Sequence, residues 1–131
     1  MSTTLNENIM SIITDYQISF GIRKVHNKDF KLISSISPTL DSMFFEFRNV
    51  IDCDDLLEVI NLRIANPPQS QDFLYTTQGL QMMKIGYSVT KMYHDVEEYE
   101  ANPNMSANYT LPTADFKEIV KAWRNFLNNE K

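Results

Sequence analysis

The sequence has few of the residues that stabilise small folds through covalent bonds or metals. It contains one cysteine, Cys53, and two histidines, His26 and His94, which stand far apart. One cysteine cannot form an intramolecular disulfide, and zinc sites need cysteine or histidine pairs at short spacing. We therefore expect neither a disulfide nor a bound metal. The single thiol also agrees with a reducing cytoplasm.

Glycine and long apolar runs are scarce as well. The three glycines, Gly21, Gly79 and Gly86, are scattered, whereas a phosphate-binding loop needs clustered glycines so that the backbone can approach the anion. No cofactor is therefore expected. No run approaches the roughly 18 consecutive apolar residues of a membrane span, and residues 1–8 lack the basic and apolar regions of a secretory signal. We expect a soluble, cytoplasmic protein that does not bind a membrane.

Acidic residues outnumber basic ones, and the surplus lies in the middle of the chain. The formal net charge is −5, and residues 52–100 hold nine Asp and Glu against three Lys and Arg. An acidic surface repels phosphate backbones, and no cluster of Lys and Arg with interleaved aromatic residues compensates for it. Direct nucleic-acid binding is therefore disfavoured. A basic protein partner is favoured, because opposite charges speed association.

Period-two alternation predicts strands in the first part of the chain. Apolar and polar residues alternate over 16–23 and again, after a polar turn at 26–29, over 30–36, which favours a hairpin and leaves a short helix over the second segment open. Residues 43–51, rich in aromatic and β-branched side chains, predict a buried strand. Asp52 is the expected N-cap of a helix over about 53–65 that ends before two prolines.

The second half predicts a loop, a strand, a second loop and a helix. Residues 69–79 are expected to form a loop, 83–93 one long strand with an apolar face, and 95–108 a polar loop. Thr113 is the expected N-cap of the last helix. Apolar residues recur there at helical spacing, namely Phe116, Ile119, Val120, Trp123, Phe126 and Leu127.

This order of elements predicts an α+β fold. We expect an antiparallel sheet of about four to five strands, helices packed mainly on one face, and a closing C-terminal amphipathic helix. The length suits a single domain over residues 1–131, with residues 1–8 flexible. A chain of this size buries about two-thirds of its extended surface and can therefore fold on its own core.

Two pairs of residues could carry catalysis, and each has a simpler structural explanation. Cys53 could act as a nucleophile with His94 as its base, but a lone thiol at a helix start is commonly a small buried residue. Asp54 and Glu58 stand one helical turn apart, as paired catalytic carboxylates can, yet the helix dipole alone favours acids in a first turn. We therefore expect no enzymatic activity. An enzyme built on Asp54 and Glu58 is the weakest alternative and requires a concave pocket around them.

Two acidic groups are the candidate partner-binding residues. The first lies at the start of the helix expected over 53–65. The second, at residues 95–100, holds four carboxylates that repel each other unless water or a cationic surface neutralises them, and it lacks the central Gly and ligand pattern of a calcium loop. Neighbouring tyrosines suit an interface because they join an apolar body to a polar tip. The candidates are Asp52, Asp54, Asp55, Glu58, Tyr93, Asp95, Glu97, Glu98, Tyr99 and Glu100.

The C-terminal third resembles a known family. Residues 111–127 follow the pattern L-P-T-x-D-F-x-x-I-x-x-x-W-x-x-F-L. This pattern, within the segment 109–127, is similar to the closing helix of small bacterial immunity proteins of polymorphic toxin systems, including contact-dependent growth inhibition. The resemblance implies a non-catalytic protein that binds the C-terminal toxic domain of a cognate effector, often a nuclease, and blocks its active site or substrate surface.

A second class of function fits the same features. Secretion chaperones are also small, acidic, cytoplasmic and α+β, but they act as dimers that hold an extended effector segment across apolar grooves. A monomer that binds a folded basic domain favours the immunity class, which we expect. A dimer that binds an unfolded segment favours the chaperone class.

Overall fold

The computed structural model describes residues 10–129, so the flexibility expected for residues 1–8 lies outside the described part. After a helical segment at residues 10–15, the elements are β1 (Ser19–Val25), β2 (Lys28–Ser34), α2 (Pro38–Phe44), α3 (Val50–Ala65), β3 (Phe73–Thr76), β4 (Met82–Ile85), β5 (Val89–Tyr93), α4 (Val96–Ala101), β6 (Tyr109–Pro112) and α5 (Thr113–Asn128). The expected α+β fold is confirmed. The strands divide into two antiparallel sheets, the pair β1-β2 and a four-stranded sheet in the order β3-β4-β5-β6.

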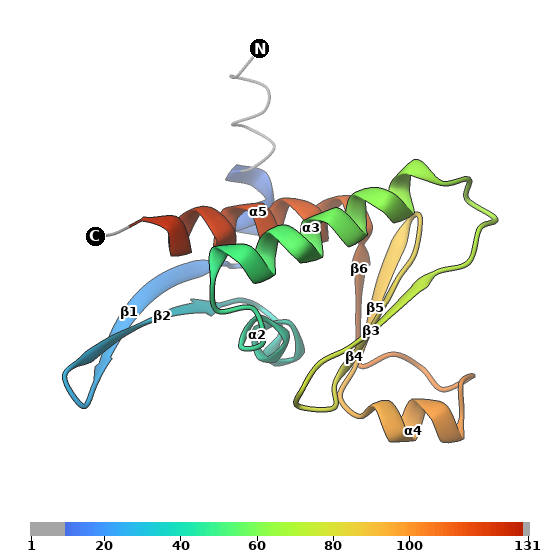
Figure 1. The fold of residues 1–131 in the computed structure, drawn as a ribbon, viewed down its shortest axis with the longest axis horizontal. Helices are drawn as coiled ribbons and strands as arrows, with labels where there is room; N and C mark the ends of the chain where they lie inside the picture. The colour runs from blue at the N-terminus through green and yellow to red at the C-terminus, as the bar shows by residue number, and fades with distance from the viewer. Residues whose placement is uncertain (1–9, 130–131) are drawn as a thin grey trace, which may run out of the picture.

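Helices cover mainly one face of the larger sheet. In Figure 1, α3 and α5 lie side by side, α2 lies beneath α3, the β1-β2 hairpin extends from one end, and α4 stands beyond the far end of the sheet. Met83, Ile85 and Met92 point from the sheet into a core that also contains Phe116 and Trp123. A smaller cluster on the opposite face joins the sheet to α4 and consists of Met82, Tyr93 and Val96, with Tyr99, Met105 and Ala107 around it.

The predicted hairpin near the N-terminus is confirmed. β1 and β2 pair from Ser19 and Ser34 to Val25 and Lys28, leaving a two-residue turn. The turn residues His26 and Asn27 both have positive φ, 51° and 67°. That conformation matches the right-handed twist of the flanking strands, which explains the tight connection.

Residues 43–51 do not form the predicted strand. Pro38 occupies the first turn of α2, and the Ser37 hydroxyl accepts the Leu40 amide at 3.2 Å. The N-cap of α3 is Asn49, whose side chain accepts the amide of Asp52 at 2.8 Å, so the prediction that Asp52 caps this helix is also wrong. Phe44 and Phe47 of this segment are buried in the core between the helices, whereas Phe45 is exposed, so burial of two aromatic residues and not strand pairing explains the pattern.

Three further boundaries differ from prediction. Residues 69–79 contain β3, residues 95–108 contain the short helix α4, and the strand predicted over 83–93 folds back as β4 and β5. The turn needs Gly86, because a Cβ there would lie 2.8 Å from the Val89 carbonyl oxygen. In an uninterrupted strand Val89 would face the core together with Met83 and Ile85. Because of the turn, Thr90 and Met92 face the core instead, and Val89 is exposed.

The closing amphipathic helix is confirmed, with a different start. Pro112 occupies the N-cap position and makes no side-chain cap, so Thr113 is the first helical residue. The Thr113 hydroxyl donates to the Gly86 carbonyl at 2.7 Å and lies 2.9 Å from the Thr90 hydroxyl. These bonds hold the start of α5 to the β4-β5 turn.

Candidate protein-binding surface

The structure places the two acidic groups apart. In Figure 1 the first group lies on the first half of α3, whereas the second lies on α4, beside the β3-β4 turn, whose Leu80 carbonyl accepts the Val96 amide at 2.8 Å. The two groups therefore lie on two separate helices.

Asp54 and Glu58 on α3 serve different purposes. Asp54 forms an ion pair with Arg124 of α5, with 2.9 Å between Oδ1 and Nε, and the ion pair raises the pKa of Arg124. Asp54 thus links the two packed helices. Glu58 is exposed and forms no ion pair with any residue in the range 10–129. Neither residue lines the hollows described below.

A solvent-facing hollow of about 350 Å³ lies between the start of α3 and the β3-β4 turn. We call it the acidic hollow. Glu46, Asp52 and Tyr75 line it, and neither carboxylate forms an ion pair within the described part of the chain. The Glu46 carboxylate lies over Gly79, where a Cβ would meet it at 3.0 Å. A glycine in this turn therefore leaves room for the carboxylate beside the hollow.

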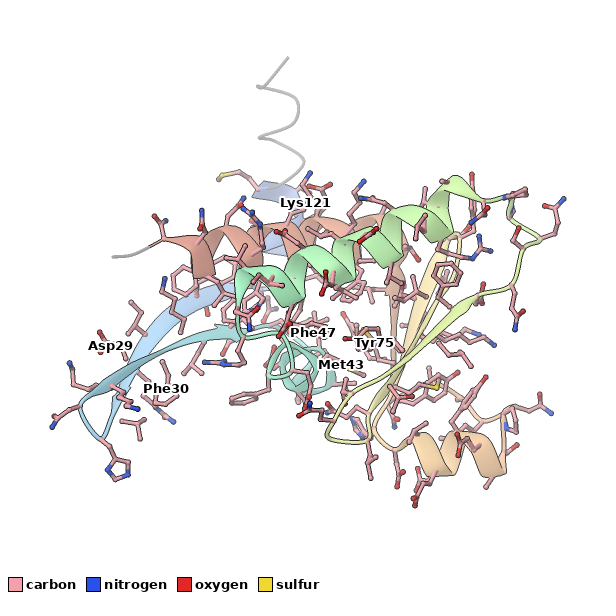
Figure 2. The ribbon with its side chains drawn as sticks, viewed as in Figure 1. Asp29, Phe30, Met43, Phe47, Tyr75 and Lys121 are labelled. Atoms are coloured by element: carbon pink, nitrogen blue, oxygen red, sulfur yellow. The ribbon has the colours of Figure 1, made fainter. Side chains whose placement is uncertain are left out.

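Tyr75 supplies the floor of the acidic hollow. Its ring packs against Phe47 with 5.5 Å between centroids, and Figure 2 shows both side chains between α3 and the sheet, near Met43. Burial raises the pKa of the Tyr75 hydroxyl, and the charges of three nearby carboxylates, those of Asp52, Asp55 and Glu46, raise it further. The Tyr75 hydroxyl therefore lies in the negative potential of three carboxylates.

An exposed aromatic side chain stands at the rim of this hollow. Phe45 is 62% exposed, and the Arg48 guanidinium lies 5.4 Å from the centre of its ring. Both residues also line a second hollow, on the other side of the 45–48 turn. An exposed Phe beside a charged hollow has the composition of an interface centre.

The group on α4 is partly engaged in the fold. The Asp95 side chain caps α4 by accepting the Glu97 amide at 2.9 Å, and Tyr93 is only 2% exposed, so a partner does not reach its ring. Tyr99 is half-buried against Tyr93, with 4.8 Å between ring centroids. The carboxylates exposed to solvent are Glu97, Glu98 and Glu100.

The residues considered for catalysis have structural partners. Cys53 is fully buried near the Phe47 carbonyl, and burial raises the pKa of its thiol to about 12. His94 Nε2 lies 2.6 Å from the Thr39 hydroxyl, a bond that joins β5 to α2. Over residues 10–129 no three His, Cys, Asp or Glu side chains are grouped to hold a metal ion. No described helix is long and apolar enough to cross a membrane.

Phe45, Glu46 and Tyr75 were not among the residues predicted from the sequence. Phe45 and Glu46 lie in a segment for which the sequence predicts a strand, and Tyr75 lies in one for which it predicts a loop. Only the packing of the 45–48 turn against β3 brings them beside Asp52 and Asp55. The signal in the sequence is Glu46, a single acidic residue between Phe45 and Phe47.

Comparison with known proteins identifies no family for the chain. No family model, curated protein or solved structure matches it. The features that point to a function are the surface around the acidic hollow and the resemblance of residues 109–127 to the closing helix of immunity proteins.

Proposed function

We propose that the chain is an immunity protein that binds and neutralises a basic toxin domain. The acidic hollow carries this proposal, because Glu46 and Asp52 form no ion pair within residues 10–129 and lie next to the exposed ring of Phe45. Arg48 is the one cation among the described residues that line it. A nuclease domain presents Lys and Arg to phosphates, so an acidic surface competes for the same cations and associates fast. The C-terminal resemblance agrees with this class of function.

In this proposal the two acidic surfaces have different tasks. The acidic hollow receives a cationic side chain of the toxin and Phe45 packs at its rim, so this region sets the lifetime of the complex. The exposed carboxylates of α4 speed the first encounter, because charges at a rim affect mainly the association rate. The protein needs no catalytic residue of its own and acts as a monomer in the cytoplasm.

The test uses the toxic domain of a secreted effector whose gene lies next to that of this chain. Co-expression should rescue cells from the domain, and the purified proteins should form a one-to-one complex. The substitution pair Asp52→Lys and Asp55→Lys should weaken the complex about tenfold or more and reduce rescue. The pair Glu97→Lys and Glu98→Lys makes the same change in charge on α4. It should slow association and reduce its salt dependence, with little change in dissociation.

Other outcomes would contradict parts of this proposal. Unchanged binding by both pairs would remove the acidic surfaces from the interface. A loss in the α4 pair alone would move the binding site to α4. A dimeric protein that holds an unfolded effector segment and gives no rescue would favour the secretion chaperone instead.

A further inference from the structure

The β1-β2 hairpin has a charge opposite to that of the rest of the chain. Residues 19–34 hold four Lys and Arg and one Asp, within a protein of net charge −5. Strand pairing divides these cations between the two faces, with Arg23 and Lys28 on one face and Lys24 and Lys31 on the other.

One face of the hairpin is occupied by α5. Phe20 stacks on Phe126 with 5.0 Å between ring centroids. The Lys31 ammonium donates to the carbonyls of Phe126 at 2.9 Å and Leu127 at 3.3 Å, at the end of α5. Strand alternation places Ile22, Lys24 and Asp29 on this inner face too. Ile22 is nevertheless 49% exposed, so α5 covers this face only around Phe20 and Lys31.

The opposite, outer face is uncovered. Arg23 pairs with Phe30 across the strands, and Val25 pairs with Lys28. Phe30 and Val25 are 40% and 38% exposed, and neither cation forms an ion pair within residues 10–129. Figure 2 shows Phe30 and Asp29 near the tip of the hairpin, on opposite sides of the ribbon. The outer face thus mixes free cations with exposed apolar groups.

This face continues into a hollow between β2 and α2. Leu32 of the outer face lines the hollow together with Ile33 of the inner face. The hollow has a volume of about 260 Å³ and mainly apolar walls, which include Pro38 and Phe44. Arg48 adds a cation. The single carboxylate in the lining, that of Asp41, accepts the Ser35 hydroxyl at 2.7 Å.

We propose that the outer hairpin face and this hollow together form a docking surface for an acidic polypeptide segment with apolar side chains. Arg23, Lys28 and Arg48 face its carboxylates, and the hollow takes an apolar side chain. The two-stranded sheet leaves one edge of each strand unpaired, along which an extended segment can bind. A nucleic acid fits less well, because the hollow is apolar and the net negative charge repels phosphates.

The test measures binding of a short fluorescent peptide of Glu and Val to the full chain by anisotropy. Matched peptides with Gln or Lys in place of Glu should bind about tenfold more weakly or not at all. Lys28→Glu should weaken binding of the acidic peptide about tenfold, whereas Lys24→Glu, the same change on the inner face of the same hairpin, should leave it unchanged. Likewise Phe30→Ser should weaken binding and Ile22→Ser should not. Circular dichroism checks that each variant is folded.

Three results would overturn this proposal. Equal loss in the Lys24 and Lys28 variants would mean that only the overall charge matters. Tighter binding of a DNA or RNA oligonucleotide than of the acidic peptide would make the hairpin a nucleic-acid site. A dimer that Phe30→Ser dissociates would make this face a contact between two copies. The variants avoid Phe45 and Arg48, which line both hollows, so the outcome is independent of the proposed toxin binding.

Discussion

The indole N–H of Trp123 donates to the main-chain carbonyl of Phe47 at 2.7 Å, across 76 residues of sequence. Both side chains are buried. The bond fixes the 45–48 turn, which separates the two hollows, to the core face of α5. The candidate binding surface therefore depends on a contact made inside the protein.

Replacing this indole should destabilise the protein. Trp123→Phe keeps an aromatic ring but leaves the Phe47 carbonyl without its donor, which should lower the free energy of unfolding by about 2 kcal/mol. Urea denaturation measures the change. An unchanged midpoint would show that water or another donor satisfies the carbonyl.

Phe45 should matter for binding and not for folding. Its ring is largely exposed, so Phe45→Ser should change the free energy of unfolding by less than about 0.5 kcal/mol. At the centre of an interface, the same substitution should cost about 2 kcal/mol of binding free energy to the toxin domain. Calorimetry of the complex and of the free protein separates the two effects. Ile51→Ser, at a more exposed apolar residue, 72% exposed, serves as the control.

Arg63 should determine the order of the loop at 66–72. Its side chain is 1% exposed, donates to the carbonyls of Pro68 at 3.1 Å and Ser70 at 2.8 Å, and pairs with Asp72. Arg63→Ala should lower the free energy of unfolding by about 3 kcal/mol and open the loop to proteases. Arg63→Lys should lower the free energy of unfolding almost as much as Arg63→Ala, because an ammonium group cannot replace the planar set of guanidinium donors. Resistance of the loop to proteases in both variants would contradict this role.

Cys53 should make stability depend on alkaline pH. Burial raises the pKa of its thiol from 9.0 to about 12, and nearby Asp52 and Asp54 contribute. Above pH 9 the unfolded chain loses this proton while the folded chain keeps it, so stability should fall as the pH rises toward 12. The free energy of unfolding, measured by urea denaturation at each pH, should decline less steeply in Cys53→Ala, by at most about 1.4 kcal/mol per pH unit. An equal decline of the free energy of unfolding with pH in Cys53→Ala and in the unmodified protein would contradict the prediction.

Local sequence signals predicted the fold where one periodicity dominated. The stripe from Phe116 to Leu127 and the alternation over 16–36 are long enough to be recognised, and both elements formed. The prediction of a strand over residues 43–51 was wrong because aromatic residues occur both in strands and in buried helix–turn segments. Here Phe44 and Phe47 are buried in a helix–turn segment. The strand predicted over 83–93 was wrong because the apolar alternation of the sequence continues through Tyr87 and Val89, although the turn at Gly86 leaves both of these side chains exposed.

The candidate site was predicted only in part. Asp52 and Asp55 were found from the charge pattern, and they do lie near the acidic hollow. Asp54 resembled them in sequence, yet an Arg on another helix pairs with it. Tyr93 was chosen for its polar tip, but the register of β4 and β5 turns it toward Met82 and away from solvent. Such outcomes depend on tertiary contacts that spacing alone does not encode.

The attachment of Lys31 to the end of α5 has a consequence for how the protein is made. A two-stranded hairpin is only marginally stable alone, and this one obtains its packing from Phe126 and its anchoring bonds from carbonyls 95 and 96 residues further along the chain. During translation the hairpin therefore lacks these anchors until residues 126 and 127 have been made. Its packing and the completion of α5 then belong to the same folding step.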